Sequence, residues 1–151
     1  MPTHVNKAPF LGVLTLLDTP SDKPPSGARG HKVILTKQAA YDALDSLIGM
    51  GVNMASDGIS HVAYAKIGVI ESAEIRGCEI LITGYLYRKD VPAIIERLAA
   101  SADYGLSYEL DNARVEDMRQ EVWTLTRVTF TGAAIIRKDK AAYHLTDFVL
   151  L

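Results

Sequence analysis

The order of apolar and polar residues predicts a chain of short strands. Runs rich in apolar, β-branched and aromatic residues are typical of strands, and four of them lie at residues 8–17, 31–35, 104–110 and 121–130. The last run is expected to bend at Gly132 and continue over 133–136. Two more runs, 67–70 and 79–87, flank the turn Arg76-Gly77, as in a β-hairpin. The pattern therefore indicates about six strands.

Helical spacing of apolar residues occurs in two segments. Over residues 37–48 these residues follow the i, i+3, i+4, i+7 order of one helix face, and the Thr36 hydroxyl can cap the first turn. A second helix is expected after a cap at Asp90, with Pro92 tolerated in its first turn. Its predicted apolar face comprises Val91, Ile94, Ile95, Leu98 and Ala102. Because strands and helices alternate irregularly, an α+β fold or a helix-decorated barrel is favoured over a doubly wound sheet.

The connecting segments are polar or rich in proline and glycine. Residues 18–30 hold three prolines and two glycines, which predicts a flexible loop without regular hydrogen bonds. Residues 53–60 are small and polar, which predicts a turn leading to His61. Residues 111–120 are charged, and we expect a loop or a short helix there.

Composition indicates one globular domain over residues 1–151. The chain has 151 residues, 48% of them hydrophobic and 23% charged, which suits a single core. A net charge of −2 argues against a nucleic-acid partner, since phosphate binding needs clustered Lys and Arg. The apolar runs are too short to cross a membrane, and the N-terminus lacks the shape of a signal peptide.

The cysteine and histidine content gives no support for a metal or other cofactor. Cys78 is the lone cysteine, so it forms no internal disulfide, and we expect a small buried side chain rather than a reactive thiol. The four histidines show no close metal-ligand spacing. We therefore predict no cofactor and no metal site.

Two residues carry candidate nucleophilic chemistry, His61 and Ser107. A serine hydroxyl is a poor nucleophile until a base takes its proton, and histidine has a suitable pKa for that role. The chain contains no phosphate-binding loop, and in the segment 105–109 a glutamate stands where a GxSxG nucleophile elbow has its last glycine. Spacing alone does not separate this Ser/His pair from unrelated turn residues.

Four segments in order resemble the prohead maturation proteases of tailed phages. The segment 61–70 resembles the histidine motif of that family, and 82–87 followed by a helix resembles its next element. The segment 104–109 resembles the Leu-Gly-Leu-Ser segment that carries the nucleophile. Residues 130–143 resemble the closing strand and loop of a phage subgroup, so the resemblance covers roughly residues 8–146.

The resemblance implies a fold like herpesvirus assemblin, a β-barrel of about six or seven mainly antiparallel strands flanked by helices. It implies a serine endopeptidase with Ser107 as the nucleophile and His61 as the general base. The backbone N–H groups of Gly132 and Ala133 are the implied oxyanion donors. The implied substrates are phage scaffold and major capsid proteins inside the prohead, in the bacterial host cytoplasm. Neither a membrane nor a nucleic acid is implied as a partner, and a homo-oligomer is left open.

The chain departs from the family pattern at two positions. Many members have an acidic residue after the histidine, where this chain has Val62. Relatives often have an acidic residue that orients the histidine at the position of Arg127, and a cation there disfavours the imidazolium formed during catalysis. Thr129 and Glu121 share a strand face with Arg127 by period two, and Thr129 is taken as the third member.

The departures leave other readings open. The site can act as a Ser/His dyad, or the chain can be an inactive protein with a protease fold that binds capsid or scaffold proteins. A small β-barrel binding module unrelated to phages is a third reading, which requires the order of the motifs to be a coincidence.

Overall fold

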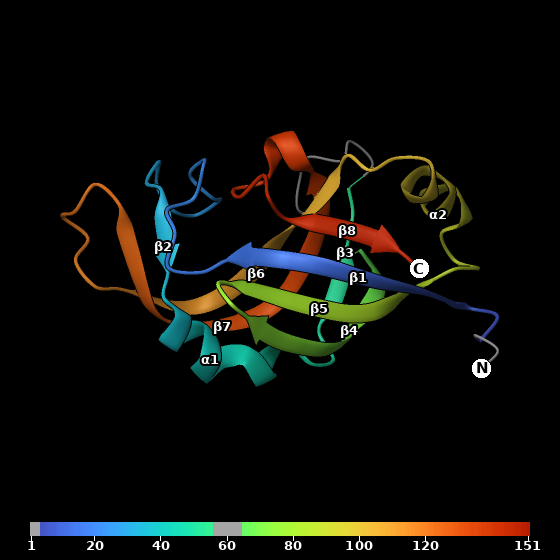
Figure 1. The fold of residues 1–151 in the computed structure, drawn as a ribbon, viewed down its shortest axis with the longest axis horizontal. Coiled ribbons are helices and arrows are strands. Elements are labelled where there is room, and N and C mark those ends of the chain that lie inside the picture. The colour runs from blue at the N-terminus through green and yellow to red at the C-terminus, as the bar shows by residue number, and fades with distance from the viewer. Residues whose placement is uncertain (1–3, 56–64) are drawn as a thin grey trace.

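The computed structural model describes residues 4–55 and 65–151, and these form one sheet with two α-helices (Figure 1). The strands are β1 (Lys7–Leu16), β2 (Val33–Leu35), β3 (Gly51–Asn53), β4 (Lys66–Arg76), β5 (Glu79–Tyr87), β6 (Tyr104–Val115), β7 (Trp123–Arg137) and β8 (Asp147–Leu150). The helices are α1 (Lys37–Ala43) and α2 (Pro92–Ala99), and short 3-10 turns cover Leu44–Leu47 and Lys138–Lys140.

The sheet is mixed, and β7 pairs with three other strands, β2, β3 and β6. Its order is β2-β7-β3-β4-β5-β1-β8, with β6 paired to β7 outside this path. β6 runs antiparallel along nearly the whole of β7, while β2 and β3 pair with β7 in parallel. The expectation of an α+β fold with mainly antiparallel strands is confirmed. The two parallel pairings were not predicted, because both involve strands of three residues.

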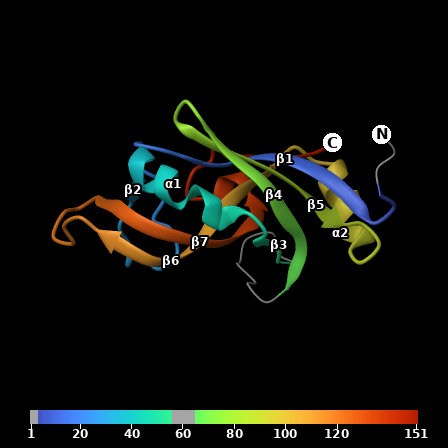
Figure 2. The same ribbon diagram turned by 90° about the horizontal axis from the view of Figure 1, so that it is seen from below.

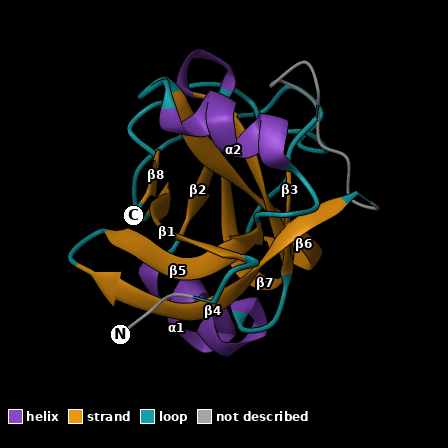
Figure 3. Ribbon diagram, turned by 90° about the vertical axis from the view of Figure 1, so that its right-hand side faces the viewer, coloured by secondary structure: helices purple, strands orange, loops and turns teal. Residues whose placement is uncertain are grey.

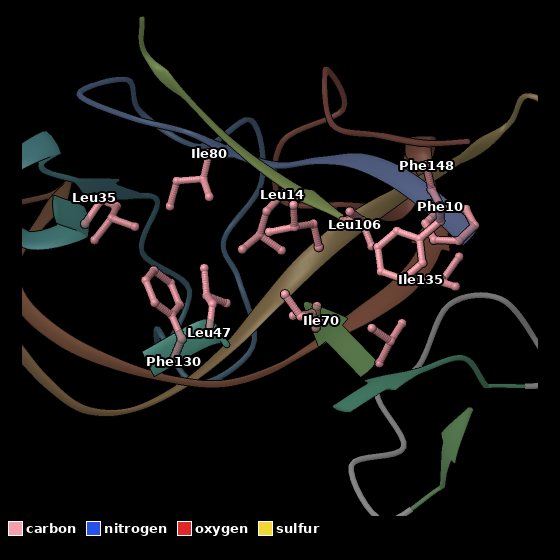
Figure 4. Close-up of a cluster of buried hydrophobic side chains, with 14 of the residues drawn as sticks. Phe10, Leu14, Leu35, Leu47, Ile70, Ile80, Leu106, Phe130, Ile135 and Phe148 are labelled. Carbon is pink, nitrogen blue, oxygen red and sulfur yellow. The ribbon is translucent and has the colours of Figure 1, made fainter. Parts of the chain in front are cut away.

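The sheet curls around a single large core, and the helices cover it on opposite sides (Figure 3). Apolar side chains from β1, β4, β5, β6 and β7 converge inside the curl, as the close-up in Figure 4 shows. At one end the rings of Phe10 and Phe148 lie 5.0 Å apart. α1 packs against β7, where Figure 2 shows it crossing that strand, and α2 packs against β8.

Several predicted elements are confirmed by the structure. Thr36 caps α1, since its hydroxyl oxygen accepts a hydrogen bond from the Ala39 N–H at 3.1 Å. The hairpin of β4 and β5 turns at Gly77, as its sequence predicts, although β4 extends further into the turn than 67–70. The segment 18–30 lacks helix and strand structure. These features depend on local residue chemistry that the sequence displays directly.

Other predictions need correction. Val91, not Asp90, occupies the cap position of α2, because the helix begins one residue later than expected, and the Asp90 carboxylate accepts a hydrogen bond from Asn6 instead. Cys78 is exposed rather than buried, because it lies in the β4–β5 turn. Ala102 is also exposed and lies beyond the end of α2.

The strands around β6 and β7 are longer and more numerous than predicted. β6 continues to Val115, so most of the charged segment 111–120 that was expected to be a loop or helix is strand and turn. β7 continues through Gly132 without ending. Where a bend was predicted, the register between β6 and β7 shifts between Glu109 and Leu110. β3 and β8 were not predicted, because each has only three or four residues.

Candidate functional site

Ser107 lies on the outer face of the sheet, near the start of β6. The register between β6 and β7 is unbroken from Tyr104 to Glu109, and Ser107 pairs with Ala134. Side chains alternate between the two faces of a strand, so Ser107 and Glu109 share the face opposite to Leu106, which is buried in the main core. The side chain of Ser107 is half-buried.

Small residues of β7 leave room on this face between β6 and β3. Gly132 pairs with Glu109 and Ala134 with Ser107 across one edge of β7. Across the other edge, Ala134 pairs with Asn53 at the end of β3. Ser107, Ala134 and Asn53 therefore form a row across three adjacent strands, and no large side chain of β7 separates β3 from β6 here.

A polar cluster fills this room. The Glu109 Oε1 atom accepts a hydrogen bond from the Asn53 Nδ2 atom at 2.9 Å, and the Lys66 Nζ atom lies 3.3 Å from the same oxygen. Asn53 is fully buried, and the Glu109 side chain is only 13% exposed. The cluster links the strand that carries Ser107 to the end of β3 and the start of β4.

A cavity of about 420 Å³ opens beside Ser107. It lies between the 25–28 segment, the first half of the β6–β7 hairpin and the start of β7. Its apolar wall is formed by Ala28, Val33, Leu110, Val115, Trp123 and Leu125. Glu109, Asp111 and Asn112 also line the cavity, and its volume lies within the range of ligand-binding pockets.

Tyr108 also lines the cavity; the residue is partly buried, and its hydroxyl oxygen is fully buried. Its hydroxyl oxygen has no hydrogen-bond partner within the part of the chain that the structure describes. Burial, and to a smaller extent the nearby Tyr143, raises the pKa of Tyr108 far above its ordinary value. The Tyr108 hydroxyl is therefore neutral at physiological pH. The Tyr108 ring packs edge-on against the Phe130 ring, with 5.9 Å between the ring centroids.

The other predicted site residues do not gather around Ser107. His61 lies outside the described residues. Thr129 is exposed and pairs with Asp111. It is five residues from Ala134 along β7, or ~16 Å at strand spacing. It borders a shallow pocket beside α1 together with Arg127.

Glu121 and Arg127 are also remote from the polar cluster. Glu121 is exposed and precedes the first residue of β7. Arg127 is exposed and pairs with Arg114, seven residues along β7 from Ala134, the partner of Ser107. None of the described members of the predicted third-residue set therefore lies beside Ser107.

Gly132 and Ala133 lie in the middle of the sheet. β7 has β6 on one side and β3 on the other at these positions. Backbone N–H groups of a strand point along the sheet toward neighbouring strands. The predicted oxyanion donors are therefore aimed into the sheet rather than out of its Ser107 face. Gly132 has a different and clear role, which is to make space for Glu109.

Sequence reasoning missed Glu109, Asn53 and Lys66 as members of this neighbourhood. Glu109 was noted only as a departure from the nucleophile elbow, although its two-residue spacing from Ser107 already places both side chains on one strand face. Nothing in the sequence marks Asn53, because it ends a three-residue strand. Its contact with Glu109 spans 56 positions.

The described residues contain no group of three His, Cys, Asp or Glu side chains arranged to hold a metal ion. Within the same residues, no helix is both long and apolar enough to cross a membrane.

Comparisons with known proteins assign no family. A scan against models of protein families finds no match, and a search of curated proteins finds none either. Among solved structures, the chain is similar to the KSHV protease in complex with a hexapeptide phosphonate inhibitor, with 12% identity and a TM-score of 0.45. The match covers 85% of this chain and 59% of that chain.

Proposed function

We propose that this chain is a serine endopeptidase of the prohead maturation type, with Ser107 as the nucleophile and His61 as the general base. The proposal also includes phage scaffold and major capsid proteins as substrates and the interior of the prohead as the place of action. These last points derive from the resemblance of four ordered sequence segments to that protease family.

The observation that carries the proposal is the setting of Ser107. A half-buried serine stands on a paired strand at the wall of an apolar cavity, two residues from a buried carboxylate. That carboxylate contacts Asn53 and Lys66, and His61 lies between these two residues in the sequence. A rigid strand holds a nucleophile more precisely than a loop does. The cavity, which Ser107 helps to line, provides space for a substrate side chain.

The chemistry follows the general acyl-transfer scheme. The Ser107 Oγ atom attacks the peptide carbonyl carbon, and the general base takes the hydroxyl proton. The base then gives this proton to the leaving amine, which separates the first product and leaves an acyl-enzyme. Water releases the second product by the same steps in reverse roles. Because the cavity wall is apolar, we expect an apolar side chain close to the cleaved bond.

The experiment is incubation of wild-type, Ser107→Ala and Ser101→Ala proteins with candidate scaffold and capsid proteins, followed by intact-mass measurement. Ser101 follows α2, outside the cavity, and serves as the matched control. We expect cleavage by wild-type and Ser101→Ala proteins and none by Ser107→Ala. Cleavage by a folded Ser107→Ala variant would overturn the assignment of Ser107.

A second candidate function is a catalytically inactive protein that binds capsid or scaffold proteins through the same fold. The observation that favours it is Arg127 itself, which stands where relatives have an orienting acid. Its partner on β6 is Arg114, so neither residue of this pair supplies a carboxylate. Binding of a capsid or scaffold protein by wild-type chain, without cleavage of that protein, supports this second function and contradicts the first.

A further inference from the structure

We propose that Glu109 is the positioning residue of the serine site. It takes the part of the orienting acid that relatives often have at position 127, where this chain has an arginine. This inference rests on the proposed function, because it assigns a part in activating Ser107. It concerns contacts that the structure describes on the outer face of β6, and it places the acid on the nucleophile's own strand rather than on β7.

Glu109 is fixed relative to Ser107 by strand geometry. The two residues share one face of β6, within a stretch whose register with β7 is unbroken. At strand spacing their Cα atoms are ~7 Å apart. The carboxylate is mostly buried, so its position is set by protein contacts rather than by solvent. Any group anchored by this carboxylate is therefore anchored relative to the Ser107 hydroxyl.

A single oxygen of Glu109 holds two different strands. Its Oε1 atom accepts a hydrogen bond from the Asn53 amide, at the end of β3, and it lies 3.3 Å from the Lys66 ammonium, at the start of β4. Asn53 and Lys66 also pair with each other in the sheet. Hydrogen bonds to an ionised carboxylate are about twice as strong as neutral ones. Glu109 thus links β6 to β3, which precedes residues 54–65 in the sequence, and to β4, which follows them.

Gly132 provides independent support for this role. A Cβ atom at Gly132 would lie 2.6 Å from Glu109 Oε1 and 3.3 Å from Lys66 Nζ, and it would also lie 3.0 Å from the Gly51 carbonyl oxygen. Contacts of 2.6 Å do not occur between such atoms, so any larger residue displaces the carboxylate. The backbone φ of Gly132 is not in the positive region, so the glycine is required for space rather than for its conformational freedom.

The test measures activation of Ser107 without knowledge of the natural substrate. A small alkyl fluorophosphonate forms a bond between phosphorus and an activated serine oxygen, fluoride leaves, and the hydroxyl proton passes to the general base. The protein gains the mass of the probe less that of HF. The labelling rate at several probe concentrations gives the limiting rate kinact and the half-saturating concentration KI, with Ser107→Ala as the label-free control.

Four variants separate a positioning role from a structural one. Glu109→Ala removes the contacts to Asn53 and Lys66. Glu109→Gln keeps an oxygen acceptor on a side chain of the same length. Gly132→Ala displaces the carboxylate while leaving it present. Glu74→Gln is the matched control, because Glu74 is an exposed glutamate in an ion pair with Arg76 at 2.7 Å. Thermal denaturation is measured for each variant, and the near-isosteric Glu109→Gln carries the test if Glu109→Ala does not fold.

We expect kinact to fall about 100-fold in Glu109→Ala, as for a displacement of about 1 Å at a reacting group, with KI unchanged. Glu109→Gln should recover part of the loss, Gly132→Ala should resemble Glu109→Ala, and Glu74→Gln should label like the wild-type protein. A wild-type kinact in a folded Glu109→Ala variant, or a change confined to KI, overturns the role of Glu109 and leaves the serine site standing. Absence of any Ser107-dependent labelling in the wild-type protein overturns the serine site, and the role of Glu109 with it.

Discussion

The contact between Gly132 and Glu109 predicts that the two residues are coupled in stability. In Gly132→Ala the added Cβ atom meets the Glu109 Oε1 atom at 2.6 Å, whereas ordinary van der Waals contacts of a Cβ atom are 3.4–4 Å. The carboxylate oxygen therefore has to move by about 0.8 Å or more. It cannot do so freely, because Asn53 and Lys66 hold it from two other strands.

The expected cost follows from the two tight contacts. Overpacking in a well-packed region usually costs about 1–3 kcal/mol. The Glu109 contact is the shorter one, but its oxygen ends a flexible side chain, whereas the Gly51 carbonyl oxygen at 3.0 Å belongs to the backbone, so we divide the cost between the two contacts. We assign about 2 kcal/mol to Gly132→Ala in the wild-type background and about 1 kcal/mol or less in a Glu109→Ala background. For a chain of this length, 2 kcal/mol corresponds to a fall in Tm of about 4–8 °C.

The assay is a double-mutant cycle by urea denaturation of the wild-type protein, the two single variants and the double variant. We expect a coupling free energy of about 1 kcal/mol, in the sense that Glu109→Ala relieves the cost of Gly132→Ala. A parallel cycle of Gly132→Ala with Glu74→Ala should be additive within about 0.5 kcal/mol, because Glu74 lies on the exposed part of β4. Additive effects of Gly132→Ala and Glu109→Ala would refute the steric argument.

Four further predictions concern Tyr108, Tyr143 and the cap of α1. Tyr108→Phe should leave the free energy of unfolding unchanged or raise it, because the Tyr108 hydroxyl is buried without a partner among the described residues. Tyr143→Phe should lower it by about 1 kcal/mol, since the one hydrogen of the Tyr143 hydroxyl is shared between the carbonyl oxygens of Thr19 and Val33; urea denaturation compares the pair. Burial raises the pKa of both tyrosines. Above about pH 10 the unfolded chain therefore releases protons that the folded chain keeps, and Tm should fall as pH rises, less steeply in the double Phe variant. Thr36→Ala should cost about 1 kcal/mol by removing the cap of α1, seen as a lower Tm, whereas Thr36→Ser should retain most of it.

The confirmed parts of the fold are those whose signals are local. The cap at Thr36, the β4–β5 hairpin at Gly77 and the proline-rich loop each depend on a few adjacent residues. β3 and β8 carry no such signal, because short strands are stabilised by pairing partners far away in the sequence. β3, for example, has Ala133 of β7 as a partner of Val52. The charged residues 111–115 form strand because the whole of β7 is available to pair with them.

The candidate site shows the same division. Ser107 is accessible to sequence reasoning because it stands in a recognisable motif, and the structure adds its face, its cavity and its pairing with Ala134. Counting back from residues 130–132 gives Arg127 at the position of the third residue, and Thr129 and Glu121 follow only from sharing its strand face by period two. That count could not reveal that Thr129 lies toward α1, because the register shift between Glu109 and Leu110 separates the two halves of the β6–β7 pair.

Glu109 and Gly132 show why an acid could not be located by motif position alone. In the role proposed for Glu109, the acid is defined by what its oxygen contacts, and those contacts come from Asn53 on β3 and Lys66 on β4. The same face accepts such an acid only because β7 has a glycine opposite it. A chain with an acid at position 109 of β6 requires this glycine for space. A small residue at 132 and an acid at 109 should therefore occur together, and introducing an acid at 127 should not replace Glu109, since position 127 lies seven residues from Ala134 along β7.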